Sequence, residues 1–185
     1  MAEYYLISQL PSLDGIHDGT PLPITEEAFS ELCQRHLGKK AFERTQALTL
    51  LPPPIPEKTG SALIDAFCEG ERALRLALAC VRAEKMNKPT DIVKKDLPIE
   101  AIRAAETAME EENPLTAEKL LLSHRLTFLE SLRPKDGFSE DYLLYYGMKL
   151  KLLSRIRGFD SARGSAAYQE IYRSTLGVER SEVTE

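Results

Sequence analysis

The histidines are the first residues to examine, because imidazole is the commonest metal ligand and general base in proteins. His17, His36 and His124 are scattered over a chain of 185 residues. No two of them form the HxxxH or HExxH spacing that places two imidazoles on one face of a helix. We therefore interpret them as structural or surface histidines, and we expect no metal site.

The other residue types that carry chemistry also occur without their motifs. The sequence contains no GxGxxG and no phosphate-binding loop that ends in Gly-Lys-Ser/Thr, and no serine lies in a nucleophile elbow. Cys33, Cys68 and Cys80 are odd in number and lack CxxC spacing, so we interpret them as buried thiols in a reducing compartment. We expect no catalytic residue, no cofactor and no enzymatic activity.

A cluster of cations near the C-terminus is the most informative polar feature. Five basic residues fall within fifteen positions, and Asp160 is the only acid among them. Lys151 and Arg155 lie at i,i+4 and repel each other by a few tenths of a kcal/mol on an isolated helix. Two interpretations remain open, namely ion pairs with the acidic stretch Glu106–Glu118 of the same chain and a patch that binds a partner.

Tyrosines accompany these cations, since five of the seven tyrosines fall in the last third of the chain. Tyrosine beside arginine is a common composition of protein interfaces. However, Tyr142, Tyr145 and Tyr146 alternate with leucines, so part of this group belongs to the core. The partner-binding surface that we predict consists of Tyr142, Tyr146, Lys149, Lys151, Arg155, Arg157 and Arg163.

Apolar residues recur at helical spacing through most of the chain. Thr25, followed by two glutamates, predicts the start of one helix, and Leu63, Phe67, Leu74 and Leu78 lie on one face of a longer one. The helices that we expect cover 25–37, 39–50, 61–87, 98–112, 116–132, 139–157 and 161–176, the last ended by Gly177. The pattern predicts an all-α protein with a multi-helix bundle.

Prolines divide this pattern into segments. We expect an N-terminal part over 1–51, in which residues 4–10 form a short strand or extended arm, and a proline-rich linker over 52–60. The main helical bundle is expected over 61–177 and a flexible tail over 178–185. Residues 78–83 resemble residues 153–158, which indicates either two related helical units or a chance likeness.

Composition excludes several classes of protein. The 29 acidic and 24 basic residues give a net charge of −5, which argues against binding to nucleic acid. No window approaches the roughly 20 apolar residues that cross a bilayer, and the first ten residues do not resemble a signal peptide. We expect a cytoplasmic protein without direct membrane insertion, which reaches the inner membrane only through partners.

The order of several segments resembles a bacterial family associated with V/A-type ATPases (ATP synthases). The segments are YYLISQLPSL at 4–13, ITEEAF at 24–29, KLKLLSR at 149–155 and GFD at 158–160. The family is similar to the stalk component of the C/d type in these ATPases. The resemblance implies an all-helical adaptor that couples the central rotor stalk to the membrane ring without catalysis. The implied partners are the rotor-stalk and membrane-ring subunits.

A second hypothesis is an unrelated helical enzyme or regulatory module. It predicts a concave apolar cavity, with several converging polar groups, near His124 or the arginines.

Overall fold

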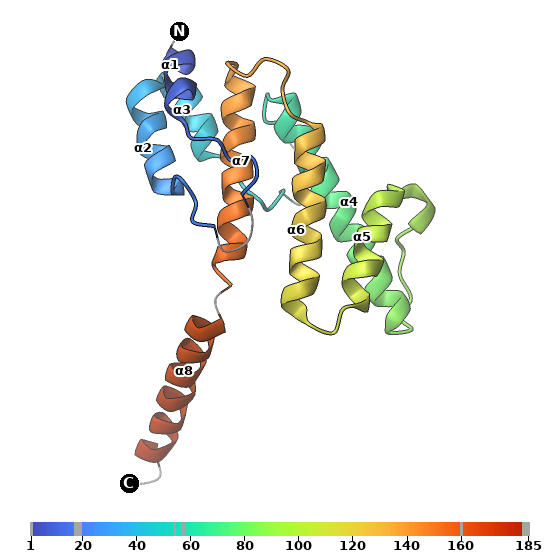
Figure 1. Ribbon diagram of the computed structural model, residues 1–185. Coiled ribbons are helices and arrows are strands. Elements are labelled where there is room, and N and C mark those ends of the chain that lie inside the picture. The colour runs from blue at the N-terminus through green and yellow to red at the C-terminus, as the bar shows by residue number, and fades with distance from the viewer. Residues whose placement is uncertain (1, 17–19, 54, 57, 160, 183–185) are drawn as a thin grey trace.

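The computed structural model in Figure 1 is built from helices. It describes residues 2–16, 20–53, 55–56, 58–159 and 161–182, and the side chains of all of these except 2, 161–163 and 176–182. Within this part the helices are α1 (Ala2–Gln9), α2 (Glu26–His36), α3 (Lys39–Gln46), α4 (Ala62–Lys85), α5 (Ile99–Glu110), α6 (Pro114–Ser131), α7 (Glu140–Arg157) and α8 (Ser161–Glu182). The predicted all-α, multi-helix fold is confirmed.

Side-chain caps explain why most of these helices begin where they do. The hydroxyls of Thr25, Ser61 and Ser139 accept hydrogen bonds from the backbone amides three residues later, at 3.2, 3.5 and 3.2 Å. These three starts were predicted and are confirmed. Helix α6 begins at Pro114, two residues earlier than expected, because proline is tolerated in the first turn and Asn113 caps it.

Helix α7 lies at the centre of the fold. It packs against α1, α2 and α3 on one side and against α4 and α6 on the other, while α5 lies against α4 and α6 (Figure 1). The buried side chains of the described residues form three apolar clusters. Helix α7 contributes to two of them, so it is buried almost all round. Residues of the N-terminal part, such as Leu6 and Phe29, therefore share a core with α7 rather than forming one of their own.

The expected strand or extended arm at residues 4–10 is wrong, because this segment forms α1. Leu6 is fully buried against α2 and α7, and Ile7 and Leu10 pack beside it. One helical turn brings these apolar residues to the same side, whereas an extended chain would have separated neighbouring ones. Burial on the body therefore outweighs the preference of the aromatic residues for strands.

Two further boundaries differ from the prediction. Helix α3 ends at Gln46 instead of residue 50. Helix α8 continues through Gly177 to Glu182, since a glycine inside a helix costs only about 1 kcal/mol and does not by itself end it. Residues 178–182, which we expected in the tail, therefore belong to α8, and 183–185 lie outside the described residues. The flexibility of the tail stays a prediction.

The proposed internal repeat falls on α4 and α7. Leu78 and Val81 are buried near the end of α4, and Leu153 and Ile156 are buried at the corresponding positions of α7. This agreement fits two related helical units, but it also fits two unrelated amphipathic helices. The duplication stays a prediction.

Candidate partner-binding surface

The predicted cations on α7 lie close to carboxylates of the same chain. Lys149 Nζ is 2.6 Å from Asp14 Oδ1 and 3.3 Å from Glu130 Oε2. Lys151 Nζ is 3.2 Å from Glu26 Oε2 at the start of α2. These contacts compensate the repulsion that the sequence indicated between successive turns of α7.

The two arginines further along α7 are also held within the fold. Arg155 Nη2 lies 2.9 Å from Glu118 Oε1 on α6. Arg157 donates to the carbonyl oxygen of Thr20 at 2.6 Å and to that of Leu153 at 2.9 Å. Of the two interpretations left open, pairing within the chain is what the structure shows, although only Glu118 comes from the predicted acidic stretch. Binding of these cations to a partner stays a prediction, and the Arg163 side chain lies outside the described residues.

The tyrosines of the predicted surface divide between core and surface. Tyr146 is buried against Phe29, and its hydroxyl donates to the carbonyl oxygen of Pro11 at 2.8 Å. Its assignment to a partner-binding surface is therefore wrong, because the alternation with leucines places it in the core. Burial also raises its pKa. Tyr142 is partly exposed and lies beside the Arg133 guanidinium, 6.0 Å from the ring centre.

A polar cluster joins the end of α6, the start of α7 and the N-terminal loop. The Tyr145 hydroxyl donates to Glu130, and Arg133 contacts both Glu130 and Asp14. The hydrogen bond from Lys149 is the main reason why the pKa of Asp14 is below its usual range. Burial would raise the pKa of Glu130, but hydrogen bonds from Tyr145 and Arg133 bring it below the usual value. Burial, reinforced by Glu130, raises the pKa of Tyr145 to about 12.

This cluster predicts a dependence of stability on pH. Because the folded pKa values of Asp14 and Glu130 lie below the unfolded ones, their stabilisation is fully present above about pH 5 and is lost as the pH falls through the folded values. Lys149 contributes to both of these lowered pKa values. The Lys149→Gln variant should therefore lose less stability than the unaltered protein when the pH falls from about 6 to about 3. Urea unfolding at the two pH values measures this difference. The exposed Lys135→Gln variant should behave like the unaltered protein, and an unchanged slope for Lys149→Gln would contradict the role of the cluster.

Exposed aromatic side chains gather at the end of the bundle where α1 meets the loop before α7. Tyr4 stacks on Phe138 with ring centroids 4.3 Å apart, and Tyr5 lies edge-on to His36 at 5.3 Å. Tyr4 and Tyr5 are each 58% exposed and Phe138 is 48% exposed. We call Tyr4, Tyr5, His36 and Phe138 the aromatic end surface. The sequence prediction missed it because a strand at 4–10 gives no reason for Tyr4 to meet a residue 134 positions away.

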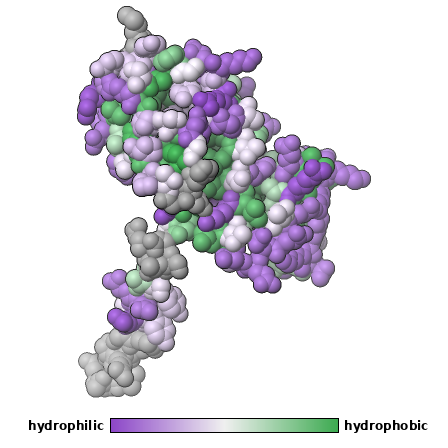
Figure 2. All heavy atoms as spheres, viewed as in Figure 1, coloured by the Kyte–Doolittle hydropathy of each residue, from purple (hydrophilic) through white to green (hydrophobic). Residues whose placement is uncertain are grey.

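Hydrophobic residues reach the surface unevenly. In Figure 2 the α5 end is almost wholly hydrophilic, whereas hydrophobic residues show over the N-terminal helices and between the lower parts of α6 and α7. His124 is half-buried on α6, and its burial together with the neighbouring Arg125 lowers its pKa. Two surface pockets beside α7 have Lys151 in their lining, and His124 lines neither of them.

The sequence and the fold were compared with known proteins, and no relative was found. No protein-family model matches the sequence, and no curated protein and no solved structure gives a significant match. Among the described residues, none of the helices combines the length and the apolar character needed to span a bilayer. In the same part of the chain, histidine, cysteine and carboxylate side chains do not assemble into a group of three or more that could hold a metal ion.

Proposed function

We propose that this chain is a non-catalytic helical adaptor of a V/A-type ATPase, which couples the central rotor stalk to the membrane ring. The proposal is supported by the resemblance of residues 4–13, 24–29, 149–155 and 158–160 to the family associated with these ATPases. The helical bundle agrees with the all-helical architecture that the resemblance implies. Such an adaptor works on the cytoplasmic side and is held at the membrane through its partners.

The aromatic end surface is the observation that carries the proposal. Exposed Tyr4, Tyr5 and Phe138 present large rings whose removal from water is favourable, and the tyrosine hydroxyls can still bond at the edge of a contact. Rings that already stack, as Tyr4 and Phe138 do, lose little freedom when a partner covers them. Aromatic residues of this kind dominate the energy of many protein interfaces.

Retention of purified subunits tests this role. The immobilised chain should retain rotor-stalk or membrane-ring subunits at moderate salt. A variant with Tyr4→Ala and Phe138→Ala should bind at least about tenfold more weakly, because each truncated aromatic hot spot costs on the order of 1–2 kcal/mol.

The control removes an exposed apolar side chain elsewhere. Ile99 is exposed on α5, at the hydrophilic end of the protein, so Ile99→Ala should leave retention unchanged. If neither subunit is retained by the unaltered chain, the adaptor role is wrong. If both are retained but the aromatic variant binds normally, the docking surface lies elsewhere.

A further inference from the structure

The corner between α2 and α3 carries positive charge beside the aromatic end surface. Arg35 lies in the last turn of α2, and Lys39 and Lys40 begin α3. The sequence has no acidic residue between Glu31 and Glu43. All three cations are exposed, and we call them the basic corner. The chain as a whole has a net charge of −5, so this corner is a positive region on a negatively charged molecule.

The basic corner is continuous with the aromatic end surface. His36 follows Arg35 directly and lies edge-on to Tyr5, with ring centroids 5.3 Å apart. Lys39 follows His36 by three residues, which span at most about 11 Å of chain. Figure 1 shows α1, which carries Tyr4 and Tyr5, at the end of the bundle where α2 meets α3. The cations and the exposed rings therefore form one surface.

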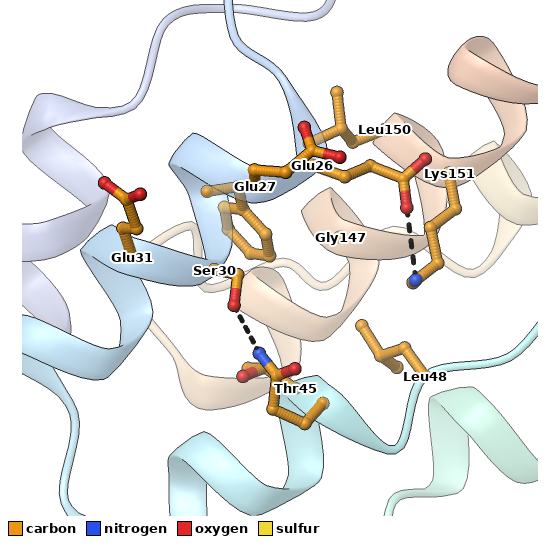
Figure 3. A pocket seen from close by; sticks show the side chains of 11 residues that line it. Glu26, Glu27, Ser30, Glu31, Thr45, Leu48, Gly147, Leu150 and Lys151 are labelled. Atoms are coloured by element: carbon orange, nitrogen blue, oxygen red, sulfur yellow. Dashed lines mark hydrogen bonds and ion pairs between the residues drawn. The ribbon is translucent and has the colours of Figure 1, made fainter.

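Two cations of the basic corner have no partner within the chain. In the part that the structure describes, Arg35 and Lys40 form no ion pair. The cations of α7 differ in this respect, as Figure 3 shows for Lys151, whose ammonium group lies 3.2 Å from the Glu26 carboxylate. The charge of the basic corner is consequently available to another molecule, whereas that of Lys151 is already compensated.

The third cation has only a weak partner. Lys39 Nζ lies 3.9 Å from Glu43 Oε1, one turn further along α3. The two side chains are 91% and 63% exposed, and such a pair stabilises a helix by no more than about 0.5 kcal/mol. This pair therefore does not explain why two lysines occur here.

The two lysines also oppose the stability of their own helix. The first turn of a helix carries a partial positive charge, so acids stabilise it and cations weaken it. Helices α2, α4, α5 and α7 have acids in their first turns. Helix α3 has none and begins with Lys39 and Lys40, without a side-chain cap. Residues that break a local rule in this way are expected where a protein binds or reacts, and here they border exposed aromatic rings.

We propose that the basic corner and the aromatic end surface together bind an acidic, partly apolar segment of a partner protein. Carboxylates of the partner pair with Arg35, Lys39 and Lys40, while its apolar side chains cover the rings of Tyr4 and Phe138. Cations beside the rings favour an acidic partner and repel a basic one. The inference rests on the docking role proposed for the aromatic end surface, but not on the partner being an ATPase subunit.

A protein segment fits this surface better than a polyanion does. Nucleic acid and anionic lipid present dense phosphate charge, and three cations neutralise little of it on a chain of charge −5. The rings of Tyr4 and Phe138 stack on each other, so one face of each is unavailable to a nucleobase. A segment that mixes carboxylates with apolar side chains needs few cations and contacts the exposed faces and edges of the rings.

Binding of designed peptides tests the charge of the partner. The acidic probe has about 15 residues, with leucine and phenylalanine on one helical face and glutamate elsewhere, and the basic probe has lysine in place of each glutamate. The net charge of the chain alone favours the basic probe. We expect instead that the full chain binds the acidic probe at least about tenfold more tightly, as measured by fluorescence anisotropy. Raising the salt from about 0.1 M to about 1 M should weaken this binding at least about threefold, because the screening length falls from about 10 Å to about 3 Å.

Charge reversal locates the binding on the chain. Lys39→Glu combined with Lys40→Glu should lower the affinity for the acidic probe at least about tenfold, because two attractions become repulsions. Glutamate suits the first turn of α3, so the helical circular-dichroism spectrum should not change. Lys88→Glu combined with Lys95→Glu is the matched control. It reverses two exposed lysines between α4 and α5, changes the net charge equally, and should leave the affinity unchanged.

The outcomes distinguish this inference from the adaptor role. Equal binding of the two probes, no binding of the acidic probe at about 1 mM, or an equal loss in the control variant overturns the acidic partner. Tighter binding to vesicles of anionic lipid or to a labelled oligonucleotide than to the acidic probe also overturns it. If the acidic probe binds as expected but the rotor-stalk and membrane-ring subunits are not retained, only the adaptor role is wrong. If the subunits are retained without dependence on salt or on Lys39 and Lys40, only the acidic partner is wrong.

Discussion

Replacing Glu71 with alanine is expected to lower the free energy of unfolding by about 3–5 kcal/mol, the usual cost of removing one partner from a buried ion pair. Glu71 is on α4 and is only 4% exposed. Its carboxylate accepts hydrogen bonds from Arg125 Nε at 2.8 Å, from Arg125 Nη2 at 3.1 Å and from Arg75 Nε at 2.9 Å. The pair with Arg125 joins α4 to α6.

The large effect follows from what remains after the substitution. The Arg125 side chain is only 12% exposed, and its other carboxylate neighbour, Glu118, is 3.6 Å away. A guanidinium without its main partner would therefore stay largely out of water, which is costly. Urea unfolding followed by circular dichroism measures the change.

The neighbouring glutamate provides the matched control. Glu69 lies two residues earlier on α4 and is exposed, so Glu69→Ala should change the stability by no more than about 0.5 kcal/mol. If Glu71→Ala costs no more than Glu69→Ala, the buried pair does not hold α4 and α6 together.

Replacing Gly70 with alanine is the second substitution with a large expected effect. A Cβ at this position would lie 2.2 Å from Cε1 of Phe128, a ring on α6. Alanine favours a helix over glycine by about 1 kcal/mol, but overpacking costs about 1–3 kcal/mol. Because the Phe128 ring packs against the buried core between α4, α6 and α7, moving it aside would cost contacts, and we expect a net loss of stability.

A double-mutant cycle isolates this contact. In a Phe128→Ala background the obstacle is gone, so Gly70→Ala should become neutral or stabilising, and the two substitutions should not be additive. Gly164 on α8 has no atom within 4 Å of an added Cβ, so Gly164→Ala should not destabilise the protein. Additive effects of Gly70→Ala and Phe128→Ala would contradict the close approach of α4 and α6.

Local signals explain which parts of the fold could be predicted. The hydroxyls of Thr25, Ser61 and Ser139 cap the amides of their own first turns, so the sequence around each is enough to locate a helix start. The apolar stripe of α4 is equally local. The all-α class followed from these features, and it is confirmed.

Contacts between distant residues explain the rest. Lys149 meets Asp14 across 135 positions, and Tyr4 meets Phe138, and no spacing rule connects either pair. In α5 the buried face is formed by alanines such as Ala105, whereas the larger Ile99 is 62% exposed. Small residues let α5 lie close to its neighbours, and such a face gives only a weak pattern of hydropathy.

Hydrogen exchange of the backbone amides tests the docking of an adaptor most directly. The exchange of the protein alone is compared with that in the presence of purified rotor-stalk and membrane-ring subunits. We predict that bound subunits slow exchange in residues 2–9 and 133–142, which carry or flank Tyr4, Tyr5 and Phe138, and leave α5 unchanged. Protection confined to α5, or no protection anywhere at saturating concentrations of both subunits, would contradict the proposed adaptor.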